Sequence, residues 1–247
     1  MSKRIFISAD HGLAVIYFLQ SDVVPTLIEA GVEVVLLTDE DLIDKIKERF
    51  GQPGLIVESL KIKKASNYLN THQPVFQFWM DYLRRAGGSN RINLEAVNSY
   101  VRGVKVEAEP PRSYLLPLTW LPVFLMRNFR LARKWFVKMQ RMYNPHLYTD
   151  LFEKFQPDLV IASTPAWRLD RYLLREAAER GVPTASVIVG WDNPSSYTQP
   201  GIPMDWITCW SELQKDELVY GSDWDEEQVF IGGIPYHNNV GQIFVNL

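Results

Sequence analysis

Residues 4–38 read RIFISADHGLAVIYFLQSDVVPTLIEAGVEVVLLT, and this stretch predicts the fold of the chain. Residues 4–8 form a short apolar strand, 15–30 have the apolar spacing of a helix, and 32–38 form a second strand. Gly31 stands between the helix and the second strand, where helices commonly end. A β-α-β unit of this kind is typical of a parallel, doubly wound sheet.

Two residues inside the helical stretch 15–30 indicate an interruption. Pro25 lacks a backbone N–H and predicts a kink or a restart of the helix. Ser21 is a candidate N-cap for the second part. We therefore expect one helix that is broken near its middle.

The alternation of strands and helices resumes late in the chain. A short strand is expected at 55–57, and residues 60–150 have mainly helical patterns. After these, strand-like and helical runs alternate again. We expect strands within 156–164, 182–190, 205–210 and 228–235, and helices at 167–181 and 211–221, the second opened by a capping box of Ser211 and Gln214.

These patterns predict one α/β domain with a Rossmann-like, doubly wound and mainly parallel sheet. The domain is expected to cover residues 1–235, with a mainly helical insertion at about 60–150. The alternation then stops without a closing helix. Residues 236–247 are accordingly predicted to begin an interdomain linker or to form a C-terminal tail.

Composition favours an ordinary globular protein of the cytoplasm. Of the 247 residues, 47% are hydrophobic, which is enough for a sizeable core. The single cysteine, Cys209, allows no internal disulfide and fits a reducing compartment. No stretch reaches the roughly 18 apolar residues of a transmembrane helix, and the polar N-terminus runs directly into the first strand.

The formal net charge of −3 hides a local excess of positive charge. Residues 110–149 contain seven basic residues and no acidic residue. On a helical wheel for 127–143, one face is basic and the opposite face is apolar. The basic face holds Arg127, Arg130, Lys134, Lys138 and Arg141.

Two interpretations of this amphipathic pattern remain open. A basic helix beside the apolar run 114–126 suits an anionic membrane surface or a lipid phosphate. It can equally be a core-packed helix whose solvated face is basic. No nucleic-acid-binding motif accompanies it, so nucleic acid is not an expected partner.

Polar residues follow the first and fourth predicted strands, at the edge where ligands bind in open parallel sheets. His11 comes at or just before a helix N-terminus, whose dipole favours the neutral imidazole that can accept a proton. Asp10 could orient this ring, and Gly12 and Thr164 lie in the same group of loops. The alternative is that His11 is a polar cap without a catalytic role.

The loop GWDNPSSYTQPG at 190–201 follows the next strand, at the same edge. It combines turn-forming residues with side chains that can bind sugar hydroxyls or a phosphate. Trp191 offers a flat face for stacking, and Asp192, Asn193 and Ser195 offer hydrogen bonds. The competing interpretation is an Asx turn in which Trp191 fills the core.

Several common motifs are absent from the sequence. No GxGxxG follows the first strand, and GxxxxGK[ST] does not occur. The four histidines are widely separated and lack metal-binding spacing, so no metal site is predicted. No cofactor is expected in this chain.

Several phrases together resemble the N-terminal, acceptor-side domain of GT-B-fold glycosyltransferases. The opening 3–40 is similar to the first β-α-β unit of these enzymes. The run KFQPDLVIASTP, the later ERGVPTASVIVGWDNPSS, and ITCWSELQKDEL with VFIGGIPYHN follow the pattern of bacterial members that build surface glycans. The resemblance covers most of the chain and is weak at 60–110.

The resemblance implies half of a GT-B architecture. In such enzymes this domain holds a glycan or lipid-linked acceptor, and a C-terminal domain holds the nucleotide-sugar donor. Some inverting members use a histidine after the first strand as general base, which implies that role for His11. The same resemblance places Asp10, Gly12, Thr164, Trp191, Asp192, Asn193 and Ser195 on the acceptor side of the cleft.

On this resemblance, a donor-binding half is expected outside residues 1–247. The expected partner is therefore that missing donor domain or a separate chain. The expected location is the cytoplasm, and the inner face of the membrane is the alternative that the basic segment leaves open. Two alternatives stay open: a non-enzymatic interaction or membrane-docking module of the same fold, and half of a sugar-nucleotide epimerase.

Overall fold

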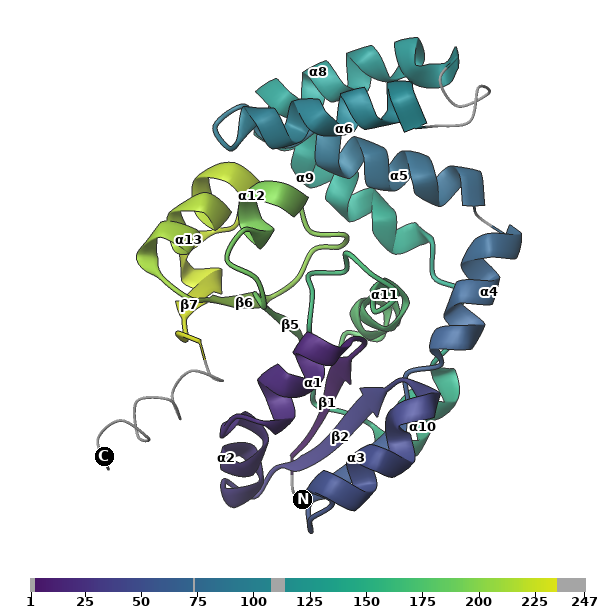
Figure 1. Ribbon diagram of the computed structural model, residues 1–247, viewed down its shortest axis with the longest axis vertical. Coiled ribbons are helices and arrows are strands. Elements are labelled where there is room, and N and C mark those ends of the chain that lie inside the picture. The colour runs from purple at the N-terminus through teal and green to yellow at the C-terminus, as the bar shows by residue number, and fades with distance from the viewer. Residues whose placement is uncertain (1–2, 73, 108–113, 235–247) are drawn as a thin grey trace.

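Seven parallel strands form one sheet in the computed structural model, which describes residues 3–72, 74–107 and 114–234 (Figure 1). Their order across the sheet is β3-β2-β1-β4-β5-β6-β7. The strands are β1 (Arg4–Ala9), β2 (Glu33–Thr38), β3 (Leu55–Ser59), β4 (Leu159–Ala162), β5 (Thr184–Val187), β6 (Trp206–Cys209) and β7 (Val229–Ile231). This is the Rossmann-like, doubly wound α/β fold that the sequence predicts.

Helices cover both faces of the sheet, so the central strands are buried on both sides. On one face α1 (Gly12–Leu19), α2 (Val23–Glu29) and α3 (Ile43–Phe50) pack on alternate residues of β1 and β2, such as Ile7 and Leu36. On the other face lie α4 (Ile62–His72), α10 (Thr149–Phe155) and α11 (Arg171–Glu179), against a cluster that includes Phe6, Val35 and Val160. Each face of the sheet therefore has its own hydrophobic core.

The helix predicted at 15–30 is two helices in the structure. Helix α1 begins three residues earlier, at Gly12, and the break falls at residues 20–22. Pro25 stands in the first turn of α2, where its missing N–H has no intrahelical partner to lose. The hydroxyl of Ser21 accepts a hydrogen bond from the Val23 amide at 3.3 Å, although the N-cap position itself is Asp22.

A layer of helices lies between β3 and β4 in the sequence. Figure 1 shows α5, α6 and α8 together at the end of the molecule opposite α2 and α3. Met80, Met126 and Phe136 form a small core that joins three of these helices. The layer consists of α5 (Pro74–Ala86), α6 (Leu94–Glu107), η2 (Leu116–Thr119), α8 (Trp120–Asn128), α9 (Arg130–Met139) and η3 (Gln140–Met142), and η1 (Glu40–Leu42) precedes α3.

The C-terminal third alternates between strands and short helices. Helix α12 (Asn193–Tyr197) lies between β5 and β6. Between β6 and β7 lie α13 (Glu212–Asp216), the π turn η4 (Glu217–Gly221) that continues it, and η5 (Glu226–Gln228). Half of the predicted capping box is present, because Ser211 Oγ accepts from the Gln214 amide at 3.4 Å. The Gln214 side chain bonds instead to the Trp210 amide at 2.8 Å. The linker or tail expected at 236–247 lies outside the described residues.

Among the described residues, no single helix is long and apolar enough to cross a membrane. Helices α1 and α2 have the length and apolar composition of a membrane span only when they are taken together, and they are bent by 43° where they meet. Much of α1 lies in the core, with Tyr17 and Phe18 buried against the sheet.

Candidate functional site

The candidate site lies between the carboxyl ends of β1 and β4. These strands are neighbours, and the chain order reverses at this point of the sheet. In doubly wound folds the loops diverge at such a switch point and leave a crevice for ligands. Residues 10–11 and 163–170 are the two loops that meet here.

Asp10 brings three side chains together in this crevice. Its Oδ1 accepts hydrogen bonds from Ser163 Oγ at 2.8 Å and from His11 Nδ1 at 2.5 Å. Its Oδ2 accepts from Arg168 Nε at 2.7 Å. The Asp10 side chain is only 2% exposed, whereas that of His11 is 20% exposed. The carboxylate of Asp10 is therefore buried, whereas the imidazole that it binds is partly exposed to solvent.

The charges around Asp10 keep it ionised. Burial alone would raise its pKa, but the hydrogen bond from His11 and the positive charge of Arg168 outweigh burial and hold the pKa below its usual value. An ionised carboxylate facing Nδ1 places the imidazole proton on that nitrogen. The lone pair of Nε2 is then available to accept a proton from a substrate.

His11 is the N-cap residue of α1, as the sequence predicts. Its backbone is extended (φ −157°, ψ 165°), and its side chain makes no hydrogen bond to the helix. The His11 ring is thus bound to Asp10, and its side chain does not cap α1. Gly12, the first residue of α1, is exposed and has no atoms near its missing Cβ.

A second carboxylate, Asp170, lies buried beneath the same loop. Its Oδ2 accepts hydrogen bonds from the Thr164 amide at 3.2 Å and from Thr164 Oγ1 at 2.8 Å. Burial raises the pKa of Asp170 to about 7, and the negative charge of Asp10 adds to the rise. Thr164 Oγ1 also accepts from the Trp167 amide, so this hydroxyl is engaged within the loop.

Arg168 and Asp170 are the functional candidates that the sequence did not reveal. The predicted helix 167–181 includes both of them, but α11 begins only at Arg171. Residues 163–170 are loop because Asp170 holds the Thr164 and Arg168 amides by hydrogen bonds (the second at 3.3 Å). An Asp directly before a helical run is a start signal, and it could have shortened the prediction.

The loop that follows β5 lies at the same edge of the sheet. It is held by its own hydrogen bonds: Ser196 Oγ donates to Asp192 Oδ2 at 3.2 Å, and Ser195 Oγ donates to the Asp192 carbonyl at 3.1 Å. A Cβ on Gly190 would lie 2.3 Å from Asn193 Oδ1, so a larger residue at position 190 would displace the Asn193 side chain.

The competing interpretation of this loop, an Asx turn in which Trp191 fills the core, is wrong. The Asp192 side chain makes no hydrogen bond to a backbone amide of α12, and Trp191 is 76% exposed. The Gly190 and Trp191 carbonyls accept from the Gln214 side chain, which ties the loop to α13. Val187 and Val189 pack in the same core cluster as Ala9, placing the loop on the same side as α1.

The basic helix predicted at 127–143 is interrupted in the structure. Phe129 has extended backbone dihedrals (φ −123°, ψ 116°) and separates α8 from α9, so Arg127 belongs to one helix and Arg130 to the next. Arg141 lies in η3. The predicted continuous basic face is therefore wrong.

Part of that positive charge is neutralised by distant acidic residues. Asp225 accepts from Arg130 at 2.6 Å and from Lys134 at 3.3 Å. Asp223 binds Arg133 through two contacts, Nε–Oδ2 at 2.5 Å and Nη2–Oδ1 at 2.9 Å. No group of three or more His, Cys, Asp and Glu side chains suited to a metal occurs in the part of the chain that the structure describes.

No family model and no curated protein matches the chain. Among solved structures, that of TcCGT1 in complex with UDP is similar to 77% of the chain, with 14% sequence identity and a TM-score of 0.34. The chain covers 29% of the length of that protein. At this level of likeness no function transfers, and the fold class rests on the strand order of the sheet itself.

Proposed function

We propose that the chain is the acceptor-binding half of a glycosyltransferase. The observation that supports it most is the hydrogen bond between His11 Nδ1 and the buried Asp10 carboxylate at the switch point. It leaves Nε2 as a base at the edge of the sheet where ligands bind. The acceptor is a glycan or a lipid-linked sugar, and the donor is a nucleotide-sugar bound by a second half.

In the proposed reaction, His11 Nε2 takes the proton of an acceptor hydroxyl. The hydroxyl oxygen forms a bond to the anomeric carbon of the donor sugar. The bond between that carbon and the phosphate oxygen breaks, and the nucleoside diphosphate leaves with the electron pair. Asp10 stabilises the imidazolium that results, while Arg168 and Ser163 hold Asp10 in place.

The loop after β5 is proposed to contact the acceptor. The exposed Trp191 ring offers a stacking face for a sugar. Asp192, Asn193 and Ser195 fix the shape of the loop by the contacts described above. We further propose that the protein works in the cytoplasm at the inner membrane face, where Arg127 and Lys138 attract anionic lipid.

The test uses cells of the organism that produces this protein, with the full protein expressed from its own gene. Three strains are compared with the parent: a gene deletion, His11→Gln, and the control His72→Gln. His72 is exposed on α4 and stacks on Tyr68 at 4.8 Å, so its replacement leaves the sheet edge intact. Glycans and lipid-linked sugars are measured by mass spectrometry, and protein levels by immunoblot.

We expect the deletion and His11→Gln to lose the same product, by about 100-fold or more, and the control to retain it. Retention of the product in the His11→Gln strain would leave only a non-enzymatic module. A deletion that changes a nucleotide-sugar pool without changing any acceptor product would indicate an epimerase half instead. Either of these two results overturns the proposal.

A further inference from the structure

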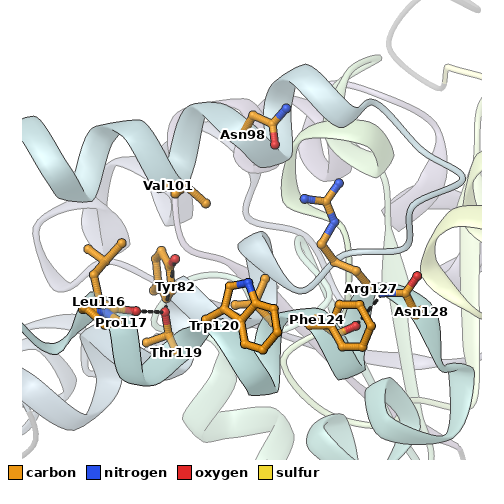
Figure 2. A pocket seen from close by; sticks show the side chains of 11 residues that line it. Tyr82, Asn98, Val101, Leu116, Pro117, Thr119, Trp120, Phe124, Arg127 and Asn128 are labelled. Carbon is orange, nitrogen blue, oxygen red and sulfur yellow. Dashed lines mark hydrogen bonds between the residues drawn. The ribbon is translucent and has the colours of Figure 1, made fainter.

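A cavity of about 730 Å³ lies between α6 and α8, far along the chain from the switch-point crevice (Figure 2). This volume is within the range of small-molecule and lipid sites, roughly 300–1,000 Å³. We call it the α6–α8 groove. Its lining includes Tyr82 of α5, Val101 of α6, and Leu116, Val123 and Phe124 of the segment around α8.

Among the described residues that line the groove, the one charged side chain, Arg127, lies at one end, and the hydroxyls of Tyr82 and Thr119 lie near the other. Figure 2 shows Leu116 and Pro117 at one end, Trp120 in the middle, and Arg127 with Asn128 at the other. Asn98 of α6 faces Arg127 across this polar end. A site with an apolar wall and a cation at one end suits an amphiphile with an anionic head.

Arg127 differs from Arg130 and Arg133, the next two arginines along the chain, because it has no carboxylate partner. Arg130 and Arg133 are both paired with Asp223 or Asp225. Within the described ranges 3–72, 74–107 and 114–234, no ion pair involves the Arg127 guanidinium. It is partly buried beside the groove, so an anion bound there would gain a hydrogen-bonded cation.

The segment that lines the groove carries many exposed apolar side chains. Trp120 is 69% exposed and stacks on Phe124 at 5.6 Å, with 15° between the rings. Exposed apolar side chains scattered singly are normal, whereas this concentration within one segment is typical of a segment that contacts a partner. The others from the same segment are Tyr114, Leu115, Leu118, Leu121, Leu125, Phe129, Leu131 and Trp135.

We propose that the α6–α8 groove binds one molecule of an anionic phospholipid drawn from a bilayer. The lipid phosphate contacts Arg127, and the start of an acyl chain lies along Val101, Val123 and Trp120. The surrounding aromatic residues rest in the headgroup region, where Trp is favoured. The absence of acidic residues from 110–149 makes the surface complementary to a negative leaflet. This inference does not depend on the chemistry of His11.

The experiment compares binding to vesicles of phosphatidylcholine with binding to vesicles that contain about a third phosphatidylglycerol. Arg127→Gln is matched with Arg141→Gln, which removes the same charge from an exposed position outside the groove. Val123→Trp fills the groove while adding apolar surface. Native mass spectrometry from detergent counts lipid molecules retained by each protein.

We expect the wild type to prefer anionic vesicles and to retain one phosphatidylglycerol. Arg127→Gln should lower the vesicle affinity about tenfold, as loss of one charge-assisted hydrogen bond predicts. Val123→Trp should also lower the vesicle affinity and abolish retention of the lipid. If the protein bound instead by nonspecific insertion of apolar side chains, the added tryptophan would strengthen vesicle binding. Arg141→Gln should stay within about twofold of the wild type, since a surface charge contributes little.

If Arg127→Gln and Arg141→Gln lowered the vesicle affinity equally, general surface electrostatics would explain the binding. That result would overturn the groove site. Equal binding to both vesicle types would overturn the anionic head. A dimer in lipid-free solution that Val123→Trp dissociates would show that a second copy covers the groove. Circular dichroism of each variant confirms that the comparison is between folded proteins.

Discussion

Asp10 connects the chemistry of the candidate site to the sheet that carries it. It accepts hydrogen bonds from Ser163 and Arg168 of the loop after β4 and from His11, and its side chain is almost fully buried. A buried carboxylate with three donors is well satisfied, whereas the same group with none would be costly. His11 therefore receives its orientation from contacts that form only when β1 and β4 are paired.

Replacing Asp10 with Asn tests this orientation directly. The amide is neutral and no longer favours a proton on His11 Nδ1, so both tautomers of the ring should become populated. The ¹⁵N chemical shifts of the His11 ring in the folded protein measure the tautomer. We also expect transfer to fall by about 100-fold or more. Unchanged ring shifts would show that Asp10 does not control the tautomer.

Asp170 predicts how the stability of the protein depends on pH. Its pKa is about 7 in the folded protein and near 3.8 when exposed, so the folded state holds the extra proton between these values. Stability from this group is therefore full below about pH 4 and falls as the pH rises towards 7. Asp170→Asn removes the ionisation and should remove this fall.

The measurement is the free energy of unfolding by urea for the wild type and Asp170→Asn at pH 5.5 and 8. We expect the wild type to lose stability relative to the variant between the two values. The lowered pKa of Asp10 acts only below about pH 4 and does not enter this range. A difference between the two proteins that stays constant with pH would contradict the raised pKa.

At the scale of elements, α9 is held by acidic residues far away in the sequence. Arg133 is buried and contacts both oxygens of Asp223, and its Nη1 donates to the Met126 carbonyl at 2.5 Å. Asp223 has a positive φ of 62°, which Asn also tolerates. The pair links the helical layer to the segment before β7.

Asp223→Asn should lower the free energy of unfolding by about 3 kcal/mol, because Arg133 is left as an unpaired buried charge. Its control is Asp225→Asn, which removes an exposed partner of Arg130 and Lys134 and should cost less than about 1 kcal/mol. Chemical denaturation measures both variants. If they lost the same stability, the buried pair would not anchor α9.

These elements also show which features the sequence could predict. Local patterns located the β-α-β unit, and Gly31 and Gly181 end their helices with φ of 81° and 69°. The contacts that hold α9 could not be predicted from local sequence, because Asp223 and Asp225 lie about 90 residues away from Arg133 and Lys134. Arg168 stayed hidden for a related reason, since its partner Asp10 lies in the loop after β1.

At the scale of the whole molecule, the parallel direction of the strands follows from the alternation of strands and helices, since parallel strands need crossover connections. The position of the helical layer does not follow from it. Met80, Met126 and Phe136 join three helices through contacts that no periodicity specifies. The α6–α8 groove is a product of this packing, so the sequence indicated only its basic and apolar composition.

The charge of the sheet edge makes a prediction about the donor. Asp10 and Asp170 are both buried between β1 and β4, and Arg168 is already paired with Asp10. A nucleoside diphosphate is multiply negative and needs unpaired cations. We therefore expect residues 1–247 alone to bind UDP-glucose or GDP-mannose with a Kd weaker than about 1 mM by titration calorimetry.

The same titration on Arg168→Gln and Arg141→Gln decides where any binding occurs. Weak binding by all three proteins agrees with a donor held by a second half. Micromolar binding by the wild type that only Arg168→Gln abolishes would instead place the donor phosphates in the crevice beside His11. The acceptor would then have to enter from elsewhere, and His11 could not be its base.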